Sequence, residues 1–380
     1  MQEMLEHQDM LRDAARRFLG ERAPVSALRR LRDNRDEAGY SPALWSEFAS
    51  MGYAGMLAPE AFGGSGLGMR DAAVLMEEVG RHLCATPFLA SSVVAVSALL
   101  DAGSEAQQQQ WLPRLAEAKA VATLALEERA RHRPEHVETR AVRHGAGWRL
   151  NGVKCFVPDG HVAELFIVAA RTSGASRDSR GISLFLAPRA AEGVQVDRTI
   201  MVDAHNFASV AFHDVDLPAD ALLGPLDGGS VPLEAALTAG RAAAAAELLG
   251  IADEVFARTL GYLKERRQFD KLIGEFQGLQ HRAAKLYIEI ELSRAALREA
   301  LQKMDDGACA DEVARAVAVA KAKCGNTAML AAQEGVQMHG GIGMTDEFDI
   351  GFFMKRARVL HAMLGDADFH IDRLARMRNY

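Results

Sequence analysis

Near its C-terminal end the sequence reads Gln337-Met-His-Gly-Gly-Ile-Gly-Met-Thr-Asp-Glu347. Apolar residues recur at helical spacing before and after this stretch, so its glycine pair falls where a long helix should end. Earlier in the chain, a second stretch without that periodicity reads Glu265-Arg-Arg-Gln-Phe-Asp-Lys-Leu-Ile-Gly-Glu-Phe-Gln277. These two stretches cut the C-terminal part of the chain into successive long helices.

Helical periodicity extends over most of the chain and is interrupted once. It predicts C-terminal helices over about 232–266, 276–305, 310–338 and 347–364, with a last helix after Gly365. From about residue 121 to 225 the apolar period changes to two, with strand-like runs at 148–150, 165–170, 182–187 and 209–212. The predicted fold class is α+β. Its expected parts are an N-terminal helical bundle (1–120), a small central β-barrel or sandwich domain (121–225) and a C-terminal four-helix bundle (226–380).

The composition is that of an ordinary globular protein, since 49% of the 380 residues are apolar and 25% are charged. The net charge of -7 comes with interspersed acidic and basic residues, which argues against a nucleic-acid partner. The longest apolar runs are too short, or too rich in Ala and Ser, for a membrane span. The acidic N-terminus lacks the features of a signal peptide, so we expect a cytoplasmic protein.

The cysteines stand singly along the chain. Cys84, Cys155, Cys309 and Cys324 form no C-x-x-C pair and are too sparse for a secreted disulfide scaffold. We therefore expect buried thiols in a reducing compartment and no metal site.

Three motifs, together with this order of helices and strands, resemble the acyl-CoA dehydrogenase family over nearly the whole chain. The stretch 265–277 is similar to the family pattern R-x-x-F-G-x-x-[IL]-x-x-x-Q, and the stretch 337–347 to Q-x-x-G-G-x-G-[FYM]-x-x-E. A third stretch, Pro59-Glu-Ala-Phe-Gly-Gly-Ser-Gly-Leu-Gly68, is similar to the family's N-terminal glycine turn. The resemblance implies FAD as cofactor and α,β-desaturation of an acyl-CoA thioester as the reaction.

In the family the first two motifs hold the adenosine and diphosphate half of an FAD that is bound mainly by the neighbouring subunit. An arginine offers diphosphate a fixed fork of donors, amides suit adenosine, and glycines let phosphate approach the backbone. The cofactor-binding residues that the resemblance implies are Arg266, Gln268, Phe269, Ile273, Phe276, Gln277, Gln337, Gly340 and Gly341.

The sequence departs from the family at the catalytic base. Most members carry a glutamate just before a glycine late in the C-terminal bundle, where this chain has Leu364. Other members place it on the first long helix of that bundle, where this chain has Gly240. The substitute candidates are Glu247, two helical turns after Gly240, and Asp366, which is also interpreted as a solvated acid at a helix end.

A second departure concerns the predicted β domain. The family loop T-E-P-x-x-G-S-D, which supports flavin and the thioester end of CoA, is matched by Leu126-Glu-Glu-Arg-Ala-Arg-His-Arg133. The family's W-I-T-N, whose threonine hydrogen-bonds near flavin N5, is matched by Phe156-Val-Pro-Asp159, and proline has no donor. The half-site for the chain's own flavin is therefore eroded, while the half-site that would reach a neighbour's flavin is retained.

This asymmetry suggests a subunit that completes a partner's FAD site. Some family members form α2β2 heterotetramers, and the C-terminal run from Gly340 resembles their small subunits, associated with steroid side-chain or dicarboxylyl-CoA oxidation. The alternatives are a self-sufficient homotetramer with a non-standard base, a flavin-dependent monooxygenase, and a helical scaffold without ligand. The family also implies an electron-transfer flavoprotein as acceptor.

One residue on the substrate side matches the family. The arginine that follows the second base position contacts the nucleotide end of CoA or the active-site loop, and this chain has Arg241 there. The resemblance therefore implies Arg241 as a substrate-side residue, and the alternative is an arginine on the helix surface. The alanine run 242–246 after it allows two interpretations, space for a bulky acyl group or a close crossing of helices.

Overall fold

The computed structural model describes residues 2–178, 180–378 and 380. They divide into two compact units. Unit 1 contains the described residues up to Arg30, together with Met69–Cys84 and Arg241–Tyr380. Unit 2 contains Leu31–Gly68 and Ala85–Gly240. Distant parts of the sequence therefore share a unit in each case.

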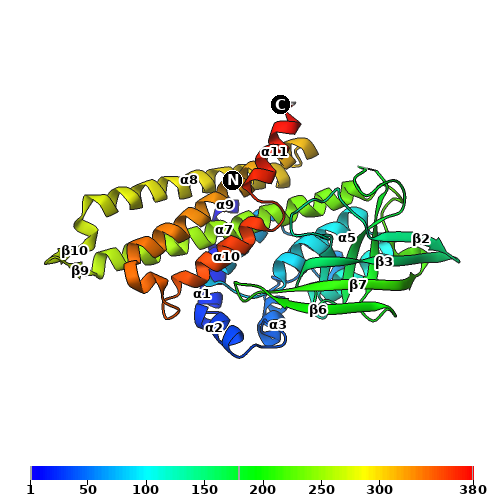
Figure 1. Ribbon diagram of the computed structural model, residues 1–380, viewed down its shortest axis with the longest axis horizontal. Helices are drawn as coiled ribbons and strands as arrows, with labels where there is room; N and C mark the ends of the chain where they lie inside the picture. The colour runs from blue at the N-terminus through cyan, green and yellow to red at the C-terminus, as the bar shows by residue number, and fades with distance from the viewer. Residues whose placement is uncertain (1, 179, 379) are drawn as a thin grey trace. The chain divides into compact units, whose positions relative to one another are not determined.

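Unit 1 is helical (Figure 1). Its long C-terminal helices pack around α9, which contacts α8, α10 and α11. The helices are α1 (Gln2–Arg22), the first part of α2 (Val25–Asp33), α4 (Met69–His82), α7 (Ser230–Glu265) from residue 241 onward, α8 (Gln277–Asp305), α9 (Ala310–His339), α10 (Ile350–Ala362) and α11 (Ala367–Met377). The short strands β9 (Arg267–Gln268) and β10 (Lys271–Leu272) and the 3-10 turns η4 (Ile273–Glu275) and η5 (Gly340–Met344) connect them.

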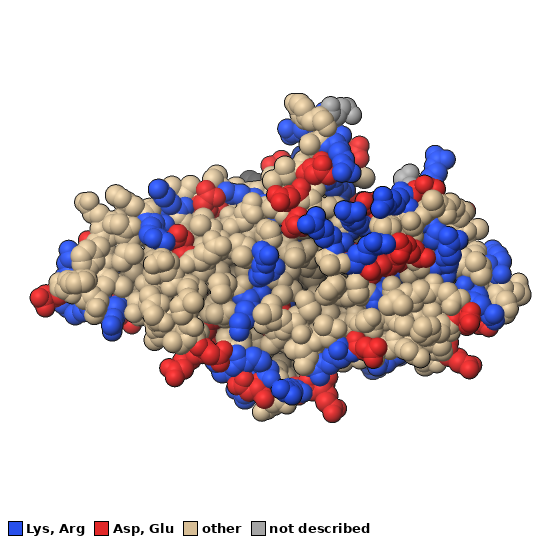
Figure 2. All heavy atoms as spheres, viewed as in Figure 1, with Lys and Arg blue, Asp and Glu red and all other residues tan. Residues whose placement is uncertain are grey.

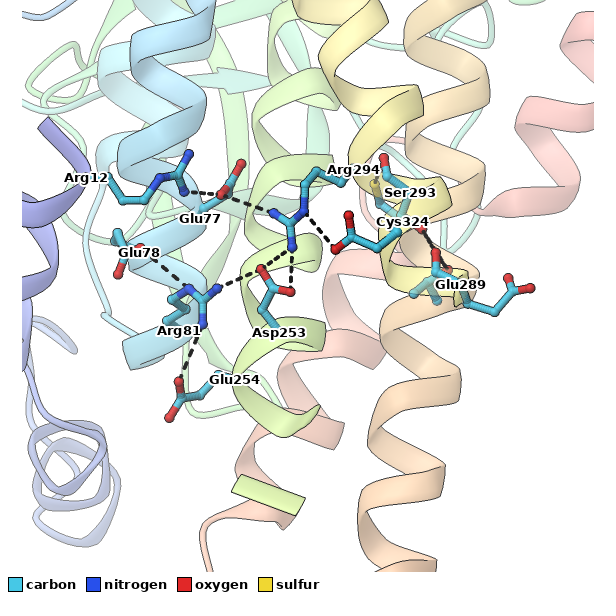
Figure 3. A network of polar contacts seen from close by, with 12 residues as sticks. Arg12, Glu77, Glu78, Arg81, Asp253, Glu254, Glu289, Ser293, Arg294 and Cys324 are labelled. Carbon is cyan, nitrogen blue, oxygen red and sulfur yellow. Dashed lines mark hydrogen bonds and ion pairs between the residues drawn. The ribbon is translucent and has the colours of Figure 1, made fainter. Parts of the chain in front are cut away.

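Buried ion pairs join α1, α4, α7 and α8 (Figure 3). Glu77 of α4 is 6% exposed and pairs with Arg12 of α1. Asp253 of α7 accepts hydrogen bonds from Arg81 of α4 and from Arg294 of α8, each at 2.7 Å. Removing one partner of a buried pair leaves an uncompensated charge, so these contacts fix which faces of the four helices meet.

Helices α4 and α7 cross closely. A Cβ atom built on Gly80 would lie 2.2 Å from the carbonyl oxygen of Glu247, and one built on Gly250 would lie 1.9 Å from that of Glu77. Only glycine permits such contact between backbones. The fully buried alanine run 242–246 directly precedes this crossing, so the structure favours the close helix crossing over space for an acyl group.

Unit 2 contains the β-sheet. Its strands in the described residues lie in the order β6-β7-β3-β2-β4-β5-β8, with β1 pairing parallel to β4. The strands are β1 (Ala122–Ala125), β2 (Arg140–His144), β3 (Gly147–Pro158), β4 (Leu165–Arg171), β5 (Ile182–Pro188), β6 (Val194–Ile200), β7 (Asn206–Leu217) and β8 (Leu222–Leu223). The helical segments are α3 (Pro42–Ser50), η1 (Glu60–Phe62), η2 (Phe88–Ala95), α5 (Val96–Ala102), α6 (Glu105–Ala116), η3 (Ala219–Ala221) and the first part of α7. Phe166, Phe185 and Phe212 lie in its core.

The structure confirms the α+β fold class, and it extends the strand predictions. Each of the four predicted runs lies inside an observed strand, but β1, β2 and β6 were not predicted. All four residues of β1 are buried, so it shows no alternation of apolar and polar residues, and β6 lies at the sheet edge with no buried residue. By length and composition α7 could cross a membrane, but 94% of its most apolar window is buried within the protein.

Candidate active site

The first cofactor motif forms a hairpin at the end of α7. Strands β9 and β10 pair antiparallel, and the two residues between them, Phe269 and Asp270, have φ angles of 53° and 63°. Such positive angles are typical of a two-residue hairpin turn, but they are unusual for an aromatic residue. Asp270 occupies the place of the glycine in the family pattern. The turn directs Phe269 outward, and 87% of its side chain is exposed.

The second cofactor motif lies at the same end of the bundle. Tyr262, one turn before Arg266, packs on His339 with ring centroids 4.6 Å apart, and His339 in turn packs on Phe348 at 4.7 Å. Gly340 follows His339 and ends α9 with a φ of 64°, which glycine adopts without strain. The stacked rings therefore bring the beginnings of the two motifs together.

The predicted FAD residues form a surface that faces outward. Arg266, Gln268, Gln277 and Gln337 are exposed, and Ile273 and Phe276 are half-buried. Phe276 supports the hairpin, because its ring lies edge-on to Phe269 at 6.2 Å and Lys271 lies 4.1 Å from its centroid.

The glycine turn is open as well. A Cβ atom built on Gly340 or Gly341 would have no described heavy atom within 4 Å. Exposed donors, an exposed aromatic ring and an open glycine turn suit an anionic nucleotide that approaches from outside this chain. The residues present therefore fit the adenosine and diphosphate half of FAD.

Leu364, which the sequence matches to the base position of most family members, lies in the turn between α10 and α11, residues 363–366. Leu364 has a φ of 59° and Gly365 a φ of 102°. Nε of Arg241 donates to the carbonyl oxygen of Leu364 at 3.1 Å, and the Arg241 side chain is only 1% exposed. The interpretation of Arg241 as a helix-surface arginine is therefore wrong. It contacts the turn that would carry the base.

The two substitute acids occupy different environments. Glu247 is fully buried, and its Oε1 accepts from Nε of Arg356 at 2.7 Å. Asp366 is exposed and caps α11, where its Oδ1 accepts from the backbone N–H of Phe369 at 2.8 Å. Glu247 is thus held in an ion pair, and Asp366 is the solvated helix-end acid of the second interpretation.

The loop that replaces T-E-P-x-x-G-S-D is fastened to strand β3 within unit 2. Lys154 of β3 is fully buried, and its Nζ donates to Oε1 of Glu128 at 2.7 Å and to the carbonyl oxygen of Leu126 at 3.1 Å. Glu128 also accepts from the backbone N–H groups of Glu138 and Thr139, at 2.6 and 2.8 Å. The carboxylate of Glu128 and the carbonyl oxygen of Leu126 are therefore engaged by the chain itself.

The surroundings disfavour the charged form of Lys154 and favour the charged form of Glu128. Burial lowers the pKa of Lys154. The pKa of Glu128 is also lowered, because Lys154 and the hydrogen bonds from Thr139 outweigh the opposing effect of burial. Lys154 was not among the residues predicted from the sequence. The only signal for it is that a single lysine stands between apolar residues in this part of the strand.

The stretch matching W-I-T-N lies at the end of β3. Phe156 has a φ of 49° and is 40% exposed, and Pro158 pairs with Phe207 in the sheet. The carbonyl oxygen of Pro158 accepts from Oγ1 of Thr123 at 2.7 Å. The carbonyl group of Pro158 is thus used as a hydrogen-bond acceptor within the sheet.

The structure also bears on metal binding. The four cysteines are free. Among the described residues, no group of three or more His, Cys, Asp or Glu side chains is placed to hold a metal ion.

Comparison with known proteins is consistent along the whole chain. Family models described as acyl-CoA dehydrogenase N-terminal, middle and C-terminal domains match residues 5–119, 122–215 and 227–377. The mitochondrial long-chain specific acyl-CoA dehydrogenase of Sus scrofa is 31% identical over 92% of this chain and 81% of its own length.

Solved structures show the same likeness. A variant of the Tcur3481-Tcur3483 steroid ACAD is 31% identical, with a TM-score of 0.88 over 98% of each chain. The ChsE4-ChsE5 complex from Mycobacterium tuberculosis is 25% identical, with a TM-score of 0.85 over 98% of this chain and 97% of that chain.

Proposed function

Because the chain belongs to the acyl-CoA dehydrogenase family of FAD-dependent oxidoreductases that act on CH–CH bonds, we propose that it completes the FAD site of a homologous partner subunit. The observation that carries this proposal is a contrast between the two family base positions and the residues implied to bind FAD. Neither family base position has a carboxylate, since they hold Leu364 and Gly240. The residues implied to bind a neighbour's cofactor, in contrast, face outward.

In this role the chain supplies binding groups. The guanidinium of Arg266 offers paired donors to a diphosphate, and Gln268 and Gln337 offer amides to an adenosine. Gly340 and Gly341 leave room for an oxygen of the diphosphate beside the backbone. When bound, FAD supplies the oxidising group that takes a hydride from the β-carbon of the acyl chain.

The closed loop of the β-sheet unit supports the same division of roles. Glu128 is engaged by Lys154 and by two backbone N–H groups, so the loop 126–133 uses its acceptors internally. Opening the loop would leave Lys154 buried without its carboxylate, which is unfavourable. A loop held in this way does not offer the hydrogen bonds that the family loop gives to flavin and thioester.

The partner is proposed to be a second dehydrogenase chain that carries the missing glutamate. The names Tcur3481-Tcur3483 and ChsE4-ChsE5 each join two chains, which supports a hetero-oligomer over a homotetramer. Figure 2 shows both acidic and basic side chains at the end of the molecule that holds the hairpin β9–β10, and a mostly uncharged area beside them. We propose an acyl-CoA, with steroid or straight-chain acyl group, as substrate and an electron-transfer flavoprotein as acceptor.

Expression with and without the partner tests this proposal. We expect the chain purified alone to hold little FAD and to turn over neither straight-chain nor steroid side-chain CoA thioesters. Co-purified with a partner that carries the glutamate, it should yield an active complex with fewer FAD molecules than chains. A full complement of FAD with turnover by the lone chain would contradict the proposal.

The self-sufficient alternative is tested by removing its candidate bases. Asp366→Asn retains an oxygen for the α11 cap, and Glu247→Gln retains the volume of the buried side chain. We expect neither change to lower the catalytic rate of the complex by the 10²-fold or more, roughly, that loss of a general base causes. A loss of that size with an unchanged unfolding curve would identify the changed residue as the base.

A further inference from the structure

Lys321 of α9 reaches the turn that holds the base position. Its side chain is 1% exposed, and its Nζ donates to the carbonyl oxygens of Leu360 at 3.0 Å, His361 at 3.2 Å and Gly365 at 2.9 Å. An ammonium group has three N–H donors, and here each has an acceptor. No motif in the sequence points to this residue.

The three carbonyl acceptors explain why a basic side chain lies there. Leu360 and His361 belong to the last turn of α10, where carbonyl groups lack helical partners and the helix dipole is negative. Gly365 lies beyond the helix, so Lys321 ties the end of α10 to the turn that follows it. Nε of Arg241 holds the preceding carbonyl, that of Leu364. Two buried basic side chains, from α7 and α9, therefore fix two successive peptide groups.

The fixed turn has a strained backbone. Leu364 lies in the left-handed region, which costs a residue with a side chain about 1 kcal/mol or more unless its surroundings impose it. A Cβ atom on Gly365 would lie 2.4 Å from the ring of Phe369, so α11 packs directly against the turn. The conformation is therefore set by neighbouring elements and not by the local sequence.

We propose that Lys321 is a positioning residue that holds the α10–α11 turn in the one conformation that presents the side chain of residue 364. The chain thus keeps the turn conformation that would position a base at residue 364, although it carries leucine there. The identification of position 364 as the base position rests on the proposed function. The contact of Lys321 with the turn does not.

Hydrogen exchange tests the positioning alone. In Lys321→Met, amides of residues 364–370 should exchange at least about tenfold faster than in the wild type, because local opening becomes easier. Lys321→Gln keeps two N–H donors and should restore part of the protection. Lys323→Met, on the same helix but paired with Glu289, is the control and should leave these amides unchanged. Unchanged exchange in both Lys321 variants would overturn the proposal.

A gain-of-function variant tests whether this turn can position a base at residue 364. In Leu364→Glu the new carboxylate should remove a deuteron from the α-carbon of an α-deuterated acyl-CoA, and a solvent proton should take its place, with no electron transferred. Mass spectrometry of the complex should then show loss of deuterium at least about tenfold faster than with the native chain. Adding Lys321→Met should lower the kcat of this exchange and leave KM unchanged, because the base is misplaced and binding is not.

The two measurements separate the two ideas. Hydrogen exchange that depends on Lys321, with no proton exchange in Leu364→Glu, would support the positioning role and contradict the assignment of residue 364 as the base position. Proton exchange in Leu364→Glu that is equally fast with Lys321→Met would overturn the positioning role.

Discussion

At the scale of single residues, Lys321 shows how burial changes the protonation of a side chain. The pKa of Lys321 is lowered to about 7, mainly by burial and then by the nearby charge of Arg241, while Cys324 and Asp366 act in the opposite direction. His361 of α10 also lies near, and burial lowers its pKa too. An unfolded chain would hold the lysine proton up to a pH of about 10.4. Between these values the unfolded state binds more protons than the folded state.

The stability of the protein should therefore rise with pH over this interval. A lowered lysine pKa contributes stability above the unfolded pKa, and this contribution is lost as the pH falls towards 7. We expect the free energy of unfolding of the wild type, relative to Lys321→Met, to increase between pH 7 and pH 9 by up to about 1.4 kcal/mol per unit. Urea titrations of both proteins at each pH measure this difference. Parallel curves would show that Lys321 does not titrate there.

At the scale of elements, α1 is attached to the bundle partly by charge. Arg12 of α1 pairs with Glu77 of α4 (Figure 3), Arg16 pairs with Glu78, and both carboxylates are buried. Burial raises the pKa of Glu77, and the charges of Arg12 and Arg294 oppose this effect. Arg294 is the more distant partner of Glu77, with 4.0 Å between its Nη1 and Oε2 of Glu77. The docking of α1 therefore depends on keeping its arginines.

Replacing Arg12 by methionine should test this attachment. The change keeps the aliphatic stem but leaves Glu77 with weaker compensation, so we expect the free energy of unfolding to fall by about 2 kcal/mol at neutral pH. The half-exposed position of Arg12 keeps this loss below that of a fully buried pair. Arg17→Met, an exposed arginine of the same helix, is the matched control and should change stability by less than about 0.5 kcal/mol. Equal effects would contradict the role of the pair.

The elements were predictable where their periodicity was strong. The predicted helices 276–305 and 310–338 agree closely with α8 and α9, because long amphipathic patterns are hard to mistake. The predicted helix 347–364 is shorter at both ends. It begins at Ile350, after the residues of η5 and a turn, and ends at Ala362, because Leu364 turns into the left-handed region. Contacts from other helices impose that ending.

At the scale of the whole molecule, the proposed role of the FAD residues requires an assembly of subunits. Arg266 and Phe269 face outward, and the open turn at Gly340 has space in front of it. We expect these exposed residues, which match a family motif, to contact the FAD of a neighbouring subunit. The location in the cytoplasm and the division into three domains stay predictions.

Arg266→Ala should separate the role in the assembly from the stability of the chain. The change removes the paired donors for the diphosphate, so the complex with the partner should hold at least about tenfold less FAD, while the unfolding curve of the lone chain stays the same. Arg267→Ala, the next residue and also exposed, is the control and should retain FAD. The ratio of flavin absorbance to protein in the purified complexes measures the outcome. Equal retention by both variants would argue against Arg266 as a cofactor residue.

The sequence by itself determined the fold class, and it predicted the positions of the two cofactor motifs and the absence of a carboxylate at both family base positions. Periodicity encodes helices and strands locally, and an absent side chain is read directly from the sequence. Only the tertiary structure decided that Arg356 pairs with Glu247, that Lys154 is buried against Glu128 and that Lys321 holds the turn at Leu364. These contacts join residues far apart in the chain, and burial, which makes them strong, is a property of the packed bundle and sheet that no local pattern contains.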